Sequence, residues 1–373
     1  MKILIAPDKF KGSLSAHQVC NAVGEALKEM DSSHEISKVP LADGGEGTFE
    51  ILVKQSHGRV KKISVRDPLQ RPIHAEYGLS KDGKVAFIEM AKASGLQLLK
   101  EIERNPLHTS TVGTGQLILD ALNEGATNII LGIGGSATND AGIGMAHALG
   151  FRFLNKKKEI VNPTGKSLSQ IDSIDDSLVD TRLRDVNCTV LCDVDNPLYG
   201  IQGAAYVYGP QKGASEEIVK ELDHGLNHFA DLVKKIKSID LNFLGAGAAG
   251  GLGAGAKLFL DATFRKGIDY ISEITGLEEK IKESDIIITG EGKVDQQTFS
   301  GKVVGHVLSL ANQYKRPVFI LCGQCTVAAD ELKRFGATSV IKLVNHPSEL
   351  NAAMTQPIPL IKSKIKQALL DLT

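Results

Sequence analysis

Five short segments of the sequence combine glycine with charged or hydroxyl-bearing residues, and each of them follows an apolar run. The segments span residues 8–13, 43–48, 134–140, 193–196 and 290–295. Glycine lets a backbone come close to a ligand, carboxylates can bind Mg²⁺ or accept a proton, and lysines offset the charge of a phosphate. Phosphoryl transfer requires these residue types, so the segments together indicate a phosphotransferase site.

The stretch 128–144 illustrates this pattern. Its continuous apolar run, Ile129–Ile133, predicts a strand that is buried on both faces. A glycine pair follows, where a backbone can approach an anion closely. The polar side chains after it can cap a helix or donate hydrogen bonds to oxygens: Ser136, Thr138 and Asn139. Asp140 would repel a phosphate, so it either belongs to a ring of carboxylates around a cation or caps the next helix.

Strand–loop–helix patterns at both ends of the chain predict a parallel sheet with crossover helices, which is an α/β fold. We expect the first strand at Ile3–Ala6, with Ser15 as the N-cap of the helix that follows it. Alternating residues between positions 59 and 90, with turn pairs such as Arg71-Pro72, indicate hairpins. The domains we expect are a Rossmann-like or flavodoxin-like parallel domain, residues 1–60 and 275–373, and an inserted mixed α+β domain, residues 61–274.

Composition excludes several classes of partner. The chain has 43 basic and 44 acidic residues, which gives a formal net charge of −1. It therefore lacks the excess of positive charge that is typical of proteins that bind nucleic acid or an anionic membrane. Its five cysteines are odd in number and lack framework spacing, which favours a reducing compartment. No signal peptide and no run of about 18 apolar residues is present, so we expect a cytoplasmic protein.

Two alternatives from other functional classes remain open. Gly245-x-Gly247-x-x-Gly250 matches a dinucleotide fingerprint, which would indicate a nicotinamide-dependent oxidoreductase. The match follows a weak candidate strand, Ile239–Leu244, and a flexible crossover or a tightly packed helix between domains explains the glycines equally simply. A non-catalytic protein that binds a nucleotide or a small molecule is the second alternative. The P-loop motif does not occur, so a kinase of this sequence is not a P-loop enzyme.

Several motifs resemble those of the class I glycerate kinase family. They are APDKFKGSLSA at 6–16, ADGGEGT at 42–48, GIGGSATNDAGIG at 132–144, CDVDNP at 192–197, GPQKGA at 209–214 and GEGKVDQQTFSGK at 290–302. Ile133, Ala141 and Lys293 depart from the family pattern, and Lys293 replaces an arginine. The resemblance extends to about residue 305 and is weaker beyond it.

The resemblance implies ATP-dependent phosphorylation of glycerate with Mg²⁺ in a cytoplasmic metabolic route. It also implies two α/β domains with the cleft between them. Members of this class are generally taken to form 2-phosphoglycerate, although some are assigned 3-phosphoglycerate. The sequence does not decide between the two hydroxyls, and it leaves open whether the protein forms a homo-oligomer.

Roles for individual residues follow from the five segments as hypotheses. A carboxylate would accept the proton of the attacking hydroxyl, and we expect Asp193 or Asp295 in this role, with Lys11 as a charge clamp. Asp195 and Glu291 are the expected Mg²⁺ ligands, although these carboxylates cannot be ranked by sequence. The residues expected to bind substrate or phosphate are Asp8, Lys9, Ser13, Asp43, Gly44, Gly134, Gly135, Ser136, Thr138, Asn139, Lys212 and Lys293.

Overall fold

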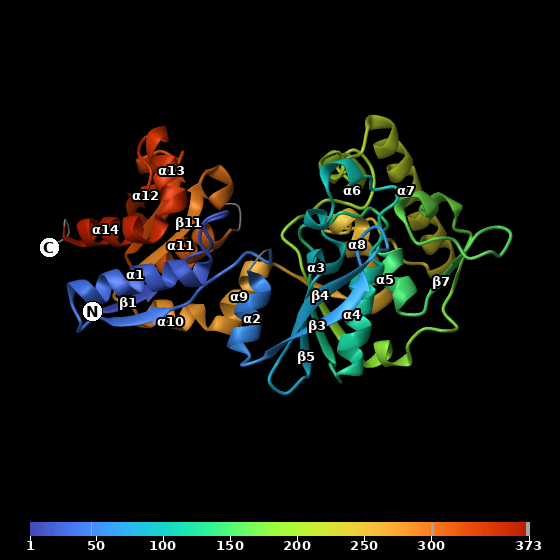
Figure 1. Ribbon diagram of the computed structural model, residues 1–373, viewed down its shortest axis with the longest axis horizontal. Helices are drawn as coiled ribbons and strands as arrows, with labels where there is room; N and C mark the ends of the chain where they lie inside the picture. Colours follow the sequence, from blue (N-terminus) through green and yellow to red (C-terminus); the bar gives the residue numbers. More distant parts are fainter. Residues whose placement is uncertain (46, 300–301, 371–373) are drawn as a thin grey trace. The chain divides into compact units, whose positions relative to one another are not determined.

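The chain forms two compact units in a computed structural model that describes residues 1–45, 47–299 and 302–370 (Figure 1). Unit 1 combines residues 1–51 with the residues from 267 onward, and unit 2 comprises Leu52–Lys266. Helix α2, Thr48–Gln55, contains the first boundary. Each unit has its own sheet. None of the described helices is long and apolar enough to cross a membrane.

Unit 1 is built on a parallel sheet whose described strands have the order β2-β1-β11-β12-β13. The strands are β1 Lys2–Ile5, β2 Glu35–Lys38, β11 Ile286–Val294, β12 Val318–Cys325 and β13 Ala337–Lys342. This is the order of flavodoxin-like sheets, in which the direction of winding reverses between the first and third strands. The reversal falls here between β1 and β11, where Ile3 lies opposite Ile286. The predicted α/β class with a flavodoxin-like parallel sheet is confirmed.

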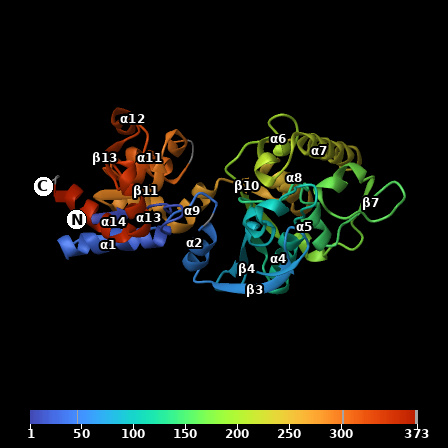
Figure 2. The same ribbon diagram turned by 45° about the horizontal axis from the view of Figure 1, so that its top comes forward.

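Helices pack against both faces of this sheet. Besides α2, the described α-helices of this unit are α1 Ala16–Met30, α9 Gly267–Thr275, α10 Leu277–Glu283, α11 Val303–Gln313, α12 Ala329–Arg334, α13 Leu350–Thr355 and α14 Pro357–Leu370. α1 and α14 lie side by side (Figures 1 and 2) and share a hydrophobic cluster with Ile3, Ile5 and Ile288. α10 contacts β1, and α11 contacts β11 and β12. The central strands are therefore covered on both sides, which explains the apolar runs of β1 and of the first part of β12; the edge strands β2 and β13 are more polar.

The predicted N-cap of α1 is confirmed, and it fixes the loop that leads out of β1. The hydroxyl of Ser15 accepts a hydrogen bond from the backbone N–H of Gln18 at 3.3 Å. The side-chain oxygen of Gln18 accepts one from the backbone N–H of Ser15 at 2.9 Å. This reciprocal capping box satisfies two donors at the start of the helix, so α1 begins at a defined residue directly after the 8–13 segment.

Unit 2 contains a mixed sheet whose described strands have the order β10-β9-β6-β5-β4-β3. The strands are β3 Arg59–Arg66, β4 Pro72–Leu79, β5 Val85–Glu89, β6 Asn128–Gly132, β9 Asn187–Leu191 and β10 Thr263–Arg265. β5, β6, β9 and β10 run parallel, whereas β3, β4 and β5 are joined antiparallel. The predicted hairpins are present, but the expected turn residue Pro72 is the first residue of β4, a strand position that proline tolerates.

The remaining elements of unit 2 cover this sheet or lie beside it. They are α3 Ala91–Ser94, α4 Val112–Asn123, α5 Ile143–Ala148, α6 Ala204–Tyr208, α7 Glu216–Lys237, α8 Ala248–Leu260, β7 Arg152–Leu154 and β8 Ser173–Asp175. The expected strand Ile239–Leu244 is wrong, because this segment is irregular. The Asp240 carboxylate accepts a hydrogen bond from the backbone N–H of Asn242 at 2.9 Å, a local turn that competes with strand pairing.

Candidate functional site

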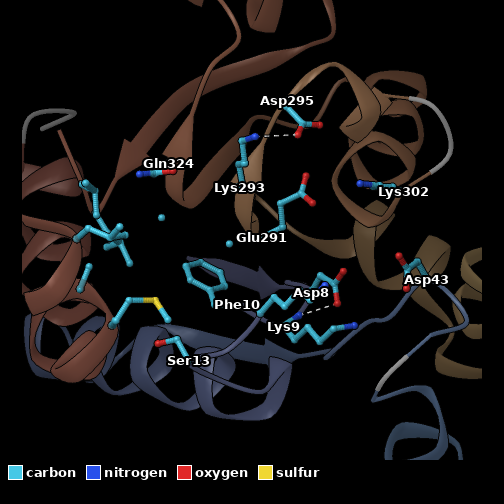
Figure 3. A pocket seen from close by; sticks show the side chains of 18 residues that line it. Asp8, Lys9, Phe10, Ser13, Asp43, Glu291, Lys293, Asp295, Lys302 and Gln324 are labelled. Carbon is cyan, nitrogen blue, oxygen red and sulfur yellow. Dashed lines mark hydrogen bonds and ion pairs between the residues drawn. The ribbon is translucent and has the colours of Figure 1, made fainter. Parts of the chain in front are cut away.

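A pocket of about 530 Å³ in unit 1 lies at the carboxyl ends of β1, β11 and β12, where the winding of the sheet reverses (Figure 3). Open parallel sheets bind their ligands at this position. The charged side chains that line the pocket are Asp8, Lys9, Lys11, Asp43, Glu291, Lys293, Asp295 and Lys302. Residues of three of the five segments, 8–13, 43–48 and 290–295, therefore meet at one pocket.

Asp8 lies just beyond β1 and is almost entirely buried. Its backbone N–H donates to the carbonyl oxygen of Gly290 at 2.8 Å, which extends the pairing of β1 with β11 past the end of the strand. Its Oδ1 accepts a hydrogen bond from the backbone N–H of Lys9 at 2.6 Å. Burial raises the pKa of the Asp8 carboxyl to about 6; the charge of Lys9 lowers it and that of Asp43 raises it. Ionisation of the Asp8 carboxyl in this pocket therefore costs free energy.

Glu291 lies on β11 and is 8% exposed. Burial raises the pKa of its carboxyl to about 7; a hydrogen bond with Thr298 and the charge of Lys302 lower the pKa, and the charges of Asp8 and Asp295 raise it. Its Oε1 has no hydrogen-bond partner in the described part of the chain. A buried, unpartnered carboxylate oxygen at a pocket indicates a position for a cation or a donor that the protein itself does not supply.

Lysines complete the charged wall of the pocket. Lys302 was not among the residues predicted from sequence, yet it lines the pocket, and its charge lowers the pKa of both buried carboxyls. Lys293 Nζ lies 3.5 Å from Asp295 Oδ2. The other carboxylate oxygen of Asp295 accepts a hydrogen bond from the backbone N–H of Gln297 at 3.0 Å. A local turn thus fixes Asp295, which in turn pairs with Lys293.

The donor set of this pocket fits a divalent cation that is shared with phosphates. Among the described residues, no group of three or more His, Cys, Asp or Glu side chains could hold a metal by itself. Asp8 and Glu291 nevertheless offer two buried carboxyls, one with an unpartnered oxygen. Mg²⁺ often binds to one or two carboxylates and completes its shell with phosphate oxygens and water. The residues therefore fit Mg²⁺ that arrives with a nucleoside phosphate.

The loop after β1 uses much of its backbone hydrogen bonding internally. The N–H of Phe10 donates to the carbonyl oxygen of Leu14, and the N–H of Ser13 donates to the carbonyl oxygen of Phe10, both at 2.8 Å. The N–H of Lys9 is bonded to the Asp8 carboxylate. A phosphate loop of the P-loop type needs such N–H groups for its ligand. This loop instead presents its charge through side chains.

The loop after β6 forms a second polar cluster, in unit 2. Its first two glycines are exposed, whereas residues 136–140 are buried. Lys212 is 2% exposed, and its Nζ donates to the carbonyl oxygen of Thr138 at 2.7 Å. Burial lowers the pKa of Lys212 to about 7, and a nearby carboxylate opposes this shift. Within the described chain, the Thr138 hydroxyl and both polar side-chain atoms of Asn139 are buried without a hydrogen-bond partner. Such atoms indicate a missing ligand or water.

Asp140 caps a helix instead of facing a ligand. It is fully buried, and burial raises the pKa of its carboxyl. The carboxylate accepts hydrogen bonds from the backbone N–H and hydroxyl of Thr111, both at 2.8 Å, and from the N–H groups of Gly142 and Gly144, both at 3.2 Å. These donors join the start of α5 to the start of α4. Of the two sequence-based alternatives, the structure supports the helix cap.

The glycine-rich segment that matched a dinucleotide fingerprint has a packing role. A Cβ atom on Gly250 would lie 1.9 Å from the carbonyl oxygen of Thr138, and one on Gly247 would lie 2.1 Å from that of Pro197. Gly250 also has a φ of +70°, which disfavours other residues. No described strand directly precedes the segment, so the dinucleotide interpretation is wrong. Gly250 thus lets α8 pack closely against the loop after β6, and Gly247 lets the chain approach the loop after β9, both inside unit 2.

The predicted site residues divide between the two units. Those that line the pocket of unit 1 are Asp8, Lys9, Lys11, Ser13, Asp43, Glu291, Lys293 and Asp295. Those in unit 2 are Gly134, Gly135, Ser136, Thr138, Asn139 and Lys212, together with the exposed Asp193 and Asp195 after β9. Gly44 belongs to unit 1 and packs against Gly267, where a Cβ would lie 2.4 Å from the Gly44 nitrogen. Glu46, Ser300 and Gly301 of the motifs lie outside the described residues.

Sequence reasoning missed part of the pocket. The residues not predicted include Lys302 and a largely apolar group, Phe10, Gln324, Leu343, Val344, Leu350, Ala353 and Met354. Lys302 ends the 290–302 motif, which could have identified it. Phe10 likewise lies within the 6–16 motif. The apolar residues between 343 and 354 carry no such signal, because leucine, valine and methionine near a strand end look like core residues in a sequence.

Comparisons with known proteins agree across the whole chain. Residues 3–372 match the model of the Glycerate kinase family. The chain is 46% identical to "Glycerate kinase" of Bacillus cereus (strain ATCC 10987 / NRS 248) and 44% identical to "Glycerate 2-kinase" of Escherichia coli (strain K12). Each match covers 95% of this chain and 93% of the relative. A crystal structure assigned to glycerate kinase 2 from Salmonella typhimurium LT2 superposes with a TM-score of 0.89 at 40% identity, covering 100% of this chain and 98% of that one.

Proposed function

The chain belongs to the glycerate kinase family, and we propose that it transfers the γ-phosphate of ATP to a hydroxyl of glycerate with the help of Mg²⁺. The name of the Escherichia coli relative, "Glycerate 2-kinase", favours 2-phosphoglycerate as the product. The free thiols of all five cysteines suit a reducing compartment such as the cytoplasm.

The observation that carries this proposal is the pocket of unit 1 with its two buried carboxyls and its lysines. Asp8 and Glu291 have raised pKa values, so each ionises more readily once a cation is near. We assign these two residues to Mg²⁺, which would neutralise charge on the phosphates. Lys11, Lys293 and Lys302 line the same pocket and would hold phosphate oxygens as point charges. Lysine in place of the family's arginine at position 293 is compatible with this role.

For the proton of the glycerate hydroxyl we keep the two carboxylates named from the sequence, Asp193 and Asp295. The unpartnered side chains of Thr138 and Asn139 beside the buried Lys212 support a role for the loop after β6 in binding substrate oxygens. Removal of the correct base should lower kcat by about 10²-fold or more while the fold stays intact. Near-native kcat in both Asp193→Asn and Asp295→Asn would refute the assignment.

A coupled assay of ADP release tests the function. The purified protein is given ATP, Mg²⁺ and a panel of small hydroxy acids, and ³¹P NMR identifies the phosphorylated carbon. We expect glycerate to be the preferred acceptor and 2-phosphoglycerate to be the product. Asp176→Asn, which alters an exposed carboxylate outside both clusters, is the matched control for the two aspartate variants. Binding of ATP without ADP release would instead support a non-catalytic nucleotide-binding protein.

A further inference from the structure

The pocket of unit 1 has an apolar half that phosphate chemistry does not explain. Its apolar lining consists of Phe10, Leu343, Val344, Leu350, Ala353 and Met354. In Figure 3, the labelled carboxylates and lysines lie on one side of Phe10, and Gln324 lies on the other. Leu343 and Val344 are hydrogen-bonded to Cys322 and Gly323, which directly precede Gln324, so apolar lining lies at the Gln324 end of the pocket.

The apolar half has a fixed wall and an exposed rim. The N–H of Leu343 donates to the carbonyl oxygen of Cys322 at 2.8 Å, and the N–H of Val344 donates to that of Gly323 at 3.0 Å. These bonds tie the wall to β12. Leu350 and Met354, by contrast, are 43% and 44% exposed. They are four residues apart on α13, so they share one helix face, and both line the pocket.

The two halves together constrain the ligand. The apolar wall belongs to the buried core of unit 1. Glycerate is small and polar, so it would leave the exposed side chains of Leu350 and Met354 uncovered. A nucleotide has a flat, weakly polar base at one end and phosphates at the other, which matches the division of the pocket. Gln324 stands at the edge of the apolar half with a side-chain amide, a group that can pair with the amino group and ring nitrogen of adenine.

We propose that this half of the pocket binds the purine base of the nucleotide, with Leu350 and Met354 of α13 packing on the ring and Gln324 bonding its edge. The inference rests on the proposed function, in which ATP is the phosphoryl donor. It assigns the base to the segment 343–354, where the sequence offered no motif. A flexible methionine at the rim suits contact with a planar ring.

The test uses the full-length double variant Leu350→Ala/Met354→Ala, with Ile358→Ala as the matched control. Ile358 is 38% exposed on α14 and does not line this pocket. Calorimetry measures the Kd of ADP and of inorganic tripolyphosphate with Mg²⁺, and kinetics give KM for ATP and for glycerate. We expect the double variant to weaken ADP binding and raise KM for ATP by about tenfold or more. Tripolyphosphate binding and KM for glycerate should stay within about twofold of wild type, and the control should match wild type throughout.

Two results would overturn the inference alone. Unchanged ADP binding in the double variant would show that the base lies elsewhere, and an equal loss of tripolyphosphate binding would show a general structural effect. Gln324→Leu provides a second arm, because it should raise KM for ATP without changing tripolyphosphate binding, and no change in that KM would remove Gln324 from the site. If the wild-type protein neither binds ADP nor produces ADP from ATP in the presence of glycerate, the proposed function itself fails, and the inference fails with it.

Discussion

Replacement of Glu291 by glutamine should stabilise the metal-free protein while it inactivates the enzyme. Burial raises the pKa of this carboxyl from 4.5 to about 7. Each pKa unit corresponds to about 1.4 kcal/mol, so an ionised Glu291 costs about 3 kcal/mol of unfolding free energy above pH 7. The unfolded chain loses this proton near pH 4.5 and the folded chain near pH 7. Stability is therefore lost as the pH rises through this interval, and glutamine, which stays neutral, avoids the loss.

The measurement is urea unfolding of Glu291→Gln and wild type in a chelating buffer, at pH 4.5 and at pH 8. Circular dichroism is the appropriate probe because the chain has no tryptophan. We expect the variant to gain about 2–3 kcal/mol at pH 8 and nothing at pH 4.5, and to lose kcat by about 10²-fold or more. Glu35→Gln, at an exposed position on β2, is the control and should shift stability by less than about 0.5 kcal/mol. Equal stability of Glu291→Gln and wild type at pH 8 would refute the reasoning.

Three further predictions concern packing, capping and thiol reactivity. In urea unfolding, Gly250→Ala should destabilise unit 2 by about 3 kcal/mol or more, because the new Cβ would collide with a carbonyl oxygen. The control Gly276→Ala should cost only about 1 kcal/mol, because Gly276 has a similar φ but open space around it. Asp140→Asn should lower the unfolding free energy by about 2–4 kcal/mol, because it weakens the cap of the helix. The Mg²⁺ dependence of the remaining activity should not change; a change would instead support a role for Asp140 at a cation. Iodoacetamide at pH 7 should label Cys325 well before Cys188. A hydrogen bond with Cys322 lowers the pKa of Cys325 to about 6, whereas burial raises the pKa of Cys188 to about 12. Mass spectrometry of samples taken over time gives the order of labelling.

The fold was largely predictable because local signals agree with the tertiary structure. Continuous apolar runs marked β1 and β6, and Ser15 marked the start of α1. The strand order β2-β1-β11-β12-β13 was not predictable in detail, since pairing depends on contacts between distant parts of the chain. The false strand Ile239–Leu244 shows the opposite case, in which an apolar-looking segment is held irregular by its own polar side chains.

The candidate site was predictable where the residues were polar and followed strands. Asp8 and Asp43 lie near the start of the chain, about 250 residues or more before Glu291, and the three meet because parallel strands end at one edge of a sheet. The role of Asp140 could not be read from its type, because a buried aspartate surrounded by N–H donors and one beside a cation look alike in sequence. The apolar wall at 343–354 was missed for the same reason: its residue types also build cores.

Charge balance explains why this pocket should need a cation before it accepts a nucleotide. Among the described residues that line it, four acids (Asp8, Asp43, Glu291 and Asp295) face four lysines (Lys9, Lys11, Lys293 and Lys302). With every carboxylate ionised the wall is neutral and has little attraction for a triphosphate. The raised pKa values of two of these acids mean that protons or a divalent cation readily offset them, and the wall then becomes positive. Backbone N–H groups of the loop after β1, such as those of Phe10 and Ser13, are bonded within the loop. In the proposed nucleotide site, we therefore expect this cation-dependent positive charge to take the place of a phosphate loop. Nucleotide and Mg²⁺ should therefore each strengthen the binding of the other by the same factor.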